Sequence, residues 1–196
     1  MRGVARRHSS VVTSDDAAQT RRIRSFAPVA RQDAETLILG SMPGVASLAA
    51  GQYYAHPRNA FWPILAKLLR IDPVSAYDER LRALVAAKIA LWDVLQSCER
   101  SGSLDTSIHR STQQPNDFRT FFRTHPRITR VVLNGTKAYD TFRRCVHEPI
   151  PGERIEVFRV PSTSPANASW SFDRKLEAWQ AALGAGVARQ LRVSLR

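Results

Sequence analysis

Four short apolar runs, each followed by polar or turn-forming residues, place the strongest constraint on the fold of this chain. They read TLILG at 36–40, KIALWDV at 88–94, RVVLNG at 130–135 and IEVFRVP at 155–161. Stretches with helical spacing of apolar residues separate the first three runs. Strands that alternate with helices in this way are typical of a parallel sheet covered by helices on both faces. The sequence therefore predicts an α/β fold.

The length of the chain bounds its domain organisation. A chain of 196 residues is long enough for one domain with a sizeable core and short for two. We expect residues 33–196 to form a single domain that acts as a monomer, with a helix over 171–186 that stops at glycine. Residues 1–32 hold seven arginines and no apolar core, so we expect a disordered basic tail there.

Hydrophobicity and charge narrow the function classes. No apolar run approaches the length that spans a bilayer, so we expect a soluble, cytoplasmic protein with no membrane partner. The formal net charge is +12, and most of the basic residues are arginines, which bind phosphate with two parallel hydrogen bonds. This balance favours nucleic acid as a partner and a place at the DNA of the cell. An arginine-rich coding bias would give the same composition.

The two cysteines, Cys98 and Cys145, are far apart in the sequence. Neither has a histidine or cysteine at metal-ligand spacing, which argues against a zinc finger or an iron-sulfur cluster. We expect reduced thiols, no metal site and no cofactor.

The loops that follow the predicted strands are where a ligand site is expected. In parallel α/β sheets, ligands bind at the carboxyl ends of the strands. The corresponding loops here are 41–60, 93–106, 134–137 and 161–170. The fold prediction therefore brings four separate segments to one pocket.

Glycine and proline dominate the start of the first loop. Gly40 and Gly44 allow backbone conformations closed to other residues, and Pro43 and Pro57 fix the chain locally. Backbone N–H groups held in this way can donate to a carbonyl or phosphate oxygen. The loop matches neither the Walker A pattern nor GxGxxG.

The second half of the first loop holds residues suited to a planar heterocycle. Tyr53 and Tyr54 offer flat faces for stacking, and Asn59 can orient a water molecule by accepting one of its protons. We expect Phe61 and Trp62, which follow, to pack the next helix instead.

Four blocks of sequence, in order, resemble the uracil-DNA glycosylase superfamily, and within it the hypoxanthine-DNA glycosylase branch, also called DNA-deoxyinosine glycosylase or family six. The blocks are GSMPG with QYYAHPRNAFW from Gly40, LWDVLQSCERSGSLD from Leu91, NDFRTFFRTHPRITRVVLNGTKAY from Asn116 and VPSTSPANASW from Val160. The resemblance runs over about 36–183.

This resemblance implies a three-layer α/β/α sandwich with a four-stranded, mainly parallel sheet. It also implies an enzyme that flips a damaged nucleotide out of DNA and hydrolyses its N-glycosidic bond. That reaction passes through an oxocarbenium-like sugar and requires no metal, cysteine nucleophile or Schiff-base lysine. The implied partner is DNA that contains a deaminated base.

Roles for individual residues follow from the same resemblance. Asn59 lies where this branch has its catalytic asparagine, and Tyr54 matches an aromatic that stacks on the extruded base. The backbone amides of Ser41 and Tyr54 match donors to a base carbonyl. The candidates for base binding are Ser41, Met42, Pro43, Gly44, Tyr53, Tyr54 and Asp93.

Two of these positions affect the choice of base. Mismatch-specific relatives read Gly-Ile-Asn-Pro-Gly, with a catalytic asparagine where this chain has Met42, and a thioether cannot activate water in that way. Met42 therefore favours hypoxanthine over uracil and transfers the catalytic role to Asn59. Asp93 lies where ordinary uracil enzymes read the base with an asparagine; a capping or loop aspartate is the alternative.

The fourth block resembles the superfamily's second motif, whose loop enters the minor groove. The candidates for DNA binding are Ser162, Thr163, Ser164, Pro165, Ala166 and Asn167, together with Lys137 from another loop. Ser162 replaces the histidine of classical uracil enzymes, so we expect no histidine to stabilise the leaving group from this loop.

The sequence also leaves open the role of three histidines and three alternative functions. We assign no general-base role to His56, His109 or His125. The alternatives to hypoxanthine removal are a mismatch-specific uracil-DNA glycosylase, a noncatalytic DNA-binding relative, and an enzyme that acts on free nucleoside monophosphates.

Overall fold

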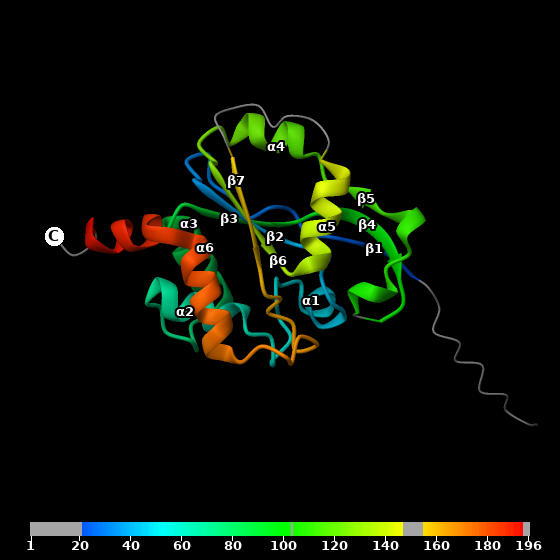
Figure 1. The fold of residues 1–196 in the computed structure, drawn as a ribbon, viewed down its shortest axis with the longest axis horizontal. Helices are drawn as coiled ribbons and strands as arrows, with labels where there is room; N and C mark the ends of the chain where they lie inside the picture. The colour runs from blue at the N-terminus through cyan, green and yellow to red at the C-terminus, as the bar shows by residue number, and fades with distance from the viewer. Residues whose placement is uncertain (1–20, 103, 147–154, 194–196) are drawn as a thin grey trace, which may run out of the picture.

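The computed structural model describes residues 21–102, 104–146 and 155–193 (Figure 1). Its strands are β1 (Arg21–Arg24), β2 (Thr36–Gly40), β3 (Ile89–Asp93), β4 (Leu95–Arg100), β5 (Gln114–Pro115), β6 (Arg130–Asn134) and β7 (Glu156–Val160). Its helices are α1 (Val45–Ala50), α2 (Phe61–Leu69), α3 (Tyr77–Ala86), α4 (Phe118–Thr124), α5 (Thr136–Cys145) and α6 (Phe172–Val193), with short 3₁₀ turns at Asp105–Ser107 and Arg110–Thr112.

The four predicted strands form one sheet in the order β3-β2-β6-β7, and every neighbouring pair in it is parallel. The chain passes from β2 to β3 on one side and later returns to β6 on the other side of β2. The carboxyl ends of β2 and β6 therefore flank the point where the strand order reverses, which is where open α/β sheets bind ligands.

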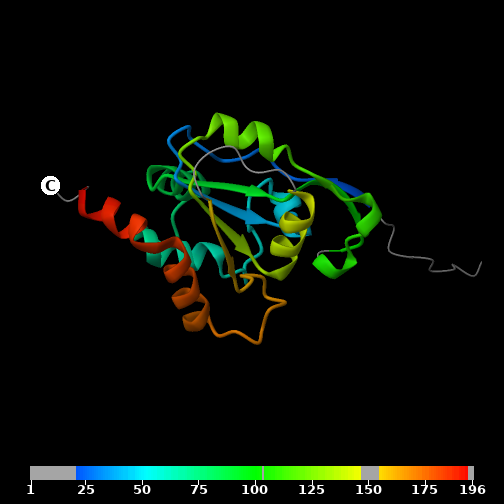
Figure 2. The same ribbon diagram turned by 45° about the horizontal axis from the view of Figure 1, so that its top comes forward.

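Helices cover both faces of this sheet, as the sequence predicts. In Figure 1, α2, α3 and α6 lie together at the left and lower left, while α4 and α5 lie at the top and right. Figure 2 shows the strands between α4 above and α6 below. The α/β/α sandwich is thus confirmed.

Alternate residues of the strands feed the two halves of the core. Ile38, Leu91 and Val132 join the cluster of α2, α3 and α6. Leu39 and Leu133 point the other way, into the cluster of α4 and α5. Since both faces of each central strand are buried, the strands read as continuous apolar runs.

The regular part of the last helix ends at a glycine, as the sequence predicts. Gly184 has φ 67° and ψ −175°, which interrupts α6. Before that point, the fully buried Trp179 lies edge-on to Phe61 of α2, with ring centroids 5.7 Å apart. Its Nε1–H donates to the carbonyl oxygen of Pro161, 3.1 Å away. Trp179 thereby joins α6, α2 and the loop after β7.

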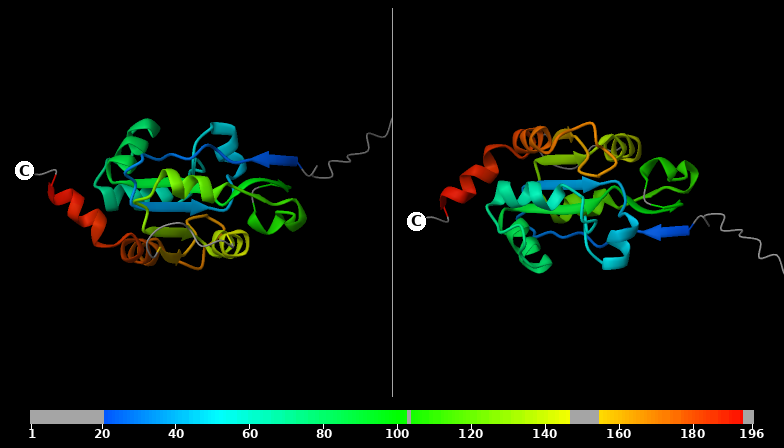
Figure 3. Two further views of the ribbon diagram at one scale, coloured as in Figure 1. Left: turned by 90° about the horizontal axis from the view of Figure 1, so that it is seen from above. Right: turned by 90° about the horizontal axis from the view of Figure 1, so that it is seen from below.

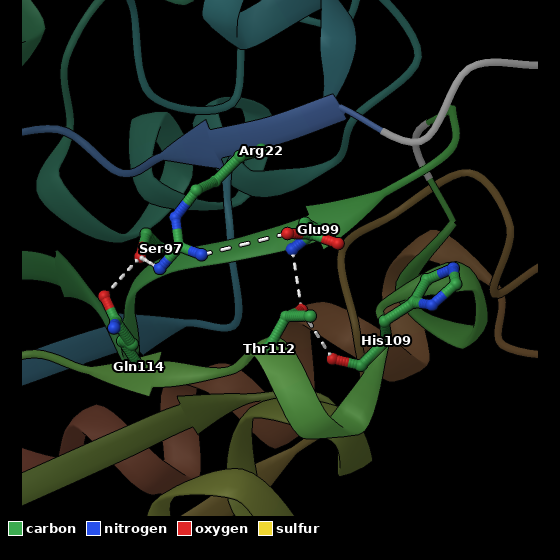
Figure 4. Close-up of polar contacts among 6 residues, drawn as sticks. All are labelled: Arg22, Ser97, Glu99, His109, Thr112 and Gln114. Carbon is green, nitrogen blue, oxygen red and sulfur yellow. Dashed lines mark hydrogen bonds and ion pairs between the residues drawn. The ribbon is translucent and has the colours of Figure 1, made fainter.

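A second, three-stranded sheet in the order β1-β4-β5 was not predicted. Strand β1 pairs antiparallel with β4. In Figure 4, the guanidinium of Arg22 lies against Ser97 and Glu99 of β4, and Ser97 in turn donates to Gln114 of β5. Ile23 packs against the small core under this sheet.

This second sheet corrects the predicted tail. Residues 21–24 are a strand, and Val29 bridges to Leu91 of β3, so the prediction of a disordered tail is wrong for 21–32. The rest of the predicted tail, residues 1–20, lies outside the described residues. Figure 3 shows β1 and the end of α6 at opposite ends of the molecule.

Of the helices in the described part of the chain, none has both the length and the apolar character that crossing a membrane needs.

We predict that Trp179→Ala lowers the free energy of unfolding by about 3–5 kcal/mol, because it opens a cavity among α2, α6 and β7. Urea denaturation measures this loss. Trp170→Ala is the matched control, since Trp170 is 37% exposed; its change should stay below about 1 kcal/mol. Equal losses for the two variants would contradict this account of the core.

Candidate functional site

The site is built around the carboxyl ends of β2 and β3. Parallel pairing sets Gly40 opposite Asp93. The chain continues past both strands without separating, because Val94 N–H donates to Gly40 O (2.8 Å) and Leu95 N–H donates to Ser41 O (3.2 Å). Two of the predicted loops, 41–60 and 93–106, are therefore held together from their first residues.

Gly40 is the point of closest approach in the site. A methyl group added there would collide with Oδ1 of Asp93 and would lie 2.9 Å from the hydroxyl oxygen of Tyr54. Two polar side chains from separate segments thus converge over the bare backbone of one glycine, where only glycine leaves room for both.

The buried polar atoms of these two side chains differ in their partners. Oδ2 of Asp93 is buried and has no hydrogen-bond partner within the described part of the chain. The hydroxyl group of Tyr54 is buried beside it and interacts with the side chain of Asn134. Buried polar atoms normally have partners, so an unpaired carboxyl oxygen at the end of a buried strand is a signature of a ligand site.

The ring of Tyr54 is held rigidly. Its backbone adopts the left-handed conformation, with φ 55°. One face of the ring stacks on Phe61, with centroids 3.8 Å apart and planes 18° apart. Burial and then the nearby Asp93 raise the pKa of the Tyr54 hydroxyl, which keeps it protonated. Tyr54 therefore offers a fixed aromatic surface and a neutral O–H.

The carboxyl group of Asp93 lies in a buried environment that disfavours its charged form. It is 3% exposed. Burial raises the pKa of Asp93 to about 8; the neighbouring Asp105 adds to the rise and Arg100 opposes it. Its backbone carbonyl accepts a hydrogen bond from the side chain of Asn116, which fixes the end of β3. Burial therefore favours the neutral acid of Asp93 over its carboxylate.

Arg100 and Asp105 brace the site from the second sheet. Arg100 is buried and donates through Nη2 to the carbonyl oxygen of Pro43, which ties the first loop to β4. Asp105 accepts a 2.7 Å hydrogen bond from Ser41. Burial raises the pKa of Asp105, while the Ser41 hydrogen bond, Arg100 and Lys137 lower it.

A pair of side chains closes the site on the β6 side. Asn134 donates through Nδ2 to Oγ1 of Thr163 and accepts from the backbone N–H of Thr163, both at 2.9 Å. The carbonyl oxygen of Thr163 in turn accepts from Ala60 N–H at 3.0 Å. A chain of hydrogen bonds therefore runs from β6 through the loop after β7 to the start of α2.

Asn59 lies next to Ala60 in this chain. Its Oδ1 accepts a 3.0 Å hydrogen bond from Phe61 N–H at the start of α2, and its own N–H donates to His56 O at 2.8 Å. The side chain is thus positioned by a helix end. An amide oxygen has two lone pairs, so Oδ1 keeps one acceptor position beyond the bond to Phe61.

The rest of the loop after β7 is braced by its own polar groups. Ser162 accepts from Ser164 N–H, and Asn167 donates through Nδ2 to Ser162 O at 3.0 Å. Lys175 of α6 donates to Asn167 O at 2.9 Å. Pro165 is half-buried and Ala166 is exposed. Pro165 and Ala166 therefore project from a supported loop.

The structure brings several of the sequence candidates together: Ser41, Pro43, Tyr54 and Asp93 around Gly40, with Asn59 joined to the same site through the next residue. Gly44 caps the start of α1, and Lys137 lies in the first turn of α5.

Three candidates make contacts inside the protein. The thioether of Met42 packs in the small core with Leu95 and Cys98. Tyr53 is buried in the main core, with its hydroxyl donating to the carbonyl oxygen of Ala27. Thr163 is 1% exposed, and its hydroxyl oxygen accepts a hydrogen bond from Asn134. The binding roles expected of these three side chains stay predictions.

The side chains of His56 and His125 contact their own segments, and His109 contributes a backbone carbonyl. Nδ1 of His56 accepts from Arg58 N–H, which shapes the His-Pro turn. His125 stacks on Phe121. The carbonyl oxygen of His109 accepts from the Thr112 hydroxyl, as Figure 4 shows.

Sequence reasoning missed Arg100, Asp105 and Asn134. Asn134 had a signal, because it is a polar residue followed by glycine at the end of an apolar run. Arg100 and Asp105 lie in the predicted loop 93–106, but nothing in the sequence distinguished them there, since the pairing of β4 that places them was not predicted.

This fold and site define a class of protein that binds a planar heterocycle. A parallel sheet between two helical layers, with a rigid tyrosine face and an unpaired polar group at the strand ends, suits a planar heterocycle.

The comparisons with known proteins make the class specific. The model of the family described as "Uracil DNA glycosylase superfamily" matches residues 27–183. The chain therefore belongs to the uracil DNA glycosylase superfamily, which confirms the resemblance.

Among curated proteins, the chain is 34% identical over 160 residues to a hypoxanthine DNA glycosylase of Methanosarcina acetivorans, covering 81% of this chain and 96% of that one. A hypoxanthine DNA glycosylase of Methanosarcina barkeri is 40% identical over 116 residues, 59% of this chain and 72% of that one. Among solved structures, a solution NMR structure of a candidate uracil DNA glycosylase of M. acetivorans superposes on this chain with a TM-score of 0.68. The two sequences are 32% identical, and the match covers 83% of this chain and 97% of that one.

We predict that Asp93→Asn stabilises the protein more at pH 8 than at pH 5. Between pH 3.8 and about pH 8 the folded chain binds a proton on Asp93 that the unfolded chain has lost. Folding stability therefore falls with rising pH by up to about 1.4 kcal/mol per unit from this group. Asparagine removes that loss.

Urea unfolding of both proteins at pH 5 and pH 8 measures the effect. Asp140→Asn, at an exposed position on α5, controls for the loss of a surface carboxylate. A stability difference between Asp93→Asn and wild type that is the same at both pH values would show that Asp93 is charged in the folded protein.

Proposed function

We propose that this protein is a monofunctional DNA glycosylase that hydrolyses the N-glycosidic bond of a flipped deaminated base, with hypoxanthine as the favoured base. The observation that carries the proposal is the meeting of the unpaired buried carboxyl group of Asp93 with the buried Tyr54 side chain above Gly40. The relatives named hypoxanthine DNA glycosylases support the choice of base.

The base would be held by its ring face and its edge. Tyr54, backed by Phe61, supplies a stacking surface that does not have to be ordered when the base arrives. The unpaired carboxyl oxygen of Asp93 supplies a hydrogen bond to the base edge. Ser41 is fixed by Asp105, which sets the backbone at the start of the loop.

Asn59 would position the attacking water. Its Oδ1 is fixed by Phe61 N–H, and its second lone pair accepts a hydrogen bond from the water. The water oxygen bonds to C1′ of the sugar, and the electron pair of the C1′–N bond leaves with the base. One water proton ends on the base and the other remains on the sugar hydroxyl, which leaves an abasic site.

DNA would be held by the loop after β7 and by the positive field of the chain, whose formal net charge is +12. Ser162, Ser164 and Asn167 lie on the braced part of that loop, and Pro165 and Ala166 project from it toward the proposed minor groove. Lys137 would add a phosphate contact. We propose that a monomer in the cytoplasm acts on DNA in this way.

The first test is a glycosylase assay on labelled duplexes that hold deoxyinosine, deoxyuridine or deoxyxanthosine at one position, with alkali used to cleave abasic sites. We expect release of hypoxanthine to be the fastest. Faster release from a G·U pair than from deoxyinosine would move the protein to the uracil branch. Equal binding of damaged and intact DNA without cleavage would indicate a noncatalytic relative.

We predict that Asn59→Ala slows hypoxanthine release by about 100-fold or more, since loss of one preorganised polar group from a reaction site costs about 10²–10³. Alanine also removes the hydrogen bond that Asn59 Oδ1 accepts from Phe61 N–H, which costs about 1 kcal/mol. Asn59→Ser is the matched variant, because serine keeps a side-chain oxygen for Phe61 N–H and loses the amide. Single-turnover rates should fall for both variants, and urea unfolding should show a loss for alanine alone. Full activity in the serine variant would limit Asn59 to a structural role at the start of α2.

A further inference from the structure

We propose that Asp93 is a catalytic residue in its neutral form, whose carboxyl O–H donates a hydrogen bond to the carbonyl oxygen of the departing base. This inference rests on the proposed glycosylase function. It assigns the stabilisation of the leaving group, for which the loop after β7 offers Ser162 where classical uracil enzymes have a histidine.

Among the described residues, Asp93 forms no ion pair. It is 3% exposed, and its Oδ2 is buried with no hydrogen bond within the described residues. Arg100 is the cation on the adjoining strand; it donates through Nη2 to Pro43 O and through Nε to Gly102 O, and its buried Nη1 forms no hydrogen bond to Asp93. An unpaired buried carboxylate costs several kcal/mol, whereas the neutral acid avoids most of that cost.

The two neighbouring carboxyl groups, Asp93 and Asp105, differ in how well their surroundings stabilise a negative charge. Asp105, on the turn after β4, has the Ser41 hydroxyl, Arg100 and Lys137 to stabilise its negative charge. Asp93 has only Arg100 to oppose burial and the charge of Asp105, and its pKa is raised to about 8. The Tyr54 hydroxyl, which converges with it over Gly40, is neutral. The proton therefore resides on Asp93.

A neutral carboxyl group matches the chemistry of a departing oxo base. It presents one O–H donor and one C=O acceptor, whereas a carboxylate presents acceptors alone. In hypoxanthine the C=O accepts from N1–H and the O–H donates to O6.

When the C1′–N9 bond breaks, its electron pair spreads through the ring onto O6, and the hydrogen bond from Asp93 strengthens. The Asp93 proton stays on Asp93, and the proton that neutralises the base comes from the attacking water. A charged carboxylate at this place would repel the departing anion instead.

The test compares single-turnover hypoxanthine release by wild type and Asp93→Asn between pH 6 and pH 9.5. The asparagine amide keeps a donor and an acceptor but does not titrate. Loss of N1–H from the substrate at high pH affects both proteins equally. We expect the ratio of wild-type to variant rate to be constant up to about pH 8, the pKa of Asp93, and to fall about tenfold per unit above it.

Asp93→Leu fills the same space without a polar atom and should lower the rate at least about 100-fold at every pH. Circular dichroism and urea unfolding verify that both variants fold. A rate ratio that does not change with pH overturns the proposed role of the proton, and so does full activity of Asp93→Leu.

A binding measurement is a second test that does not depend on turnover. The probe is a duplex with 2′-fluoro-deoxyinosine, whose fluorine destabilises the cationic sugar and blocks cleavage. We expect its affinity for wild type, relative to an intact duplex of the same sequence and to the same ratio for Asp93→Asn, to fall above about pH 8. A constant relative affinity with intact hypoxanthine release overturns this inference alone. Absence of both release and preferential binding overturns the proposed function, and this inference with it.

Discussion

The parallel register of β2 with β3 is the constraint on which the rest of the site depends. It places Gly40 beside Asp93, and the missing side chain of Gly40 is what admits both the carboxyl group and the Tyr54 hydroxyl. A shift of one residue would turn Asp93 to the opposite face of the sheet. The apolar cores on the two faces prevent that shift, because each strand buries alternate side chains in different clusters. Packing far from the site thus determines where the acid lies.

Much of the fold was predictable from the sequence because its signals are local. The four strands of the main sheet are apolar runs in the sequence, and Gly184 indicates where the regular part of α6 ends. The second sheet was missed because β1 and β4 are rich in arginine and other polar residues. Their pairing is a long-range event, and short polar strands carry no periodic pattern.

The site was predictable where a residue's role follows from its own loop, and not where it follows from contact across the fold. Tyr54 and Asn59 lie in one loop with recognisable chemistry. Tyr53 has the same side chain as Tyr54, but a left-handed backbone at Tyr54 sends the two rings to different places. Residue type alone could not separate these neighbours. The partners of Arg100 and Asp105 likewise depend on a hairpin that the sequence does not mark.

The double hydrogen bond between Asn134 and Thr163 has a consequence for how a duplex would be engaged. It fastens the loop after β7 to the centre of the sheet, and Asn167 and Lys175 fasten the far side of the same loop. A loop fixed at both sides changes its own shape little. Under the proposed function, the nucleic acid would then bend and open to meet the protein. Lesions that weaken base pairing lower the cost of that deformation. The stiffness of the loop would then itself select damaged sites, before any atom of the base is read.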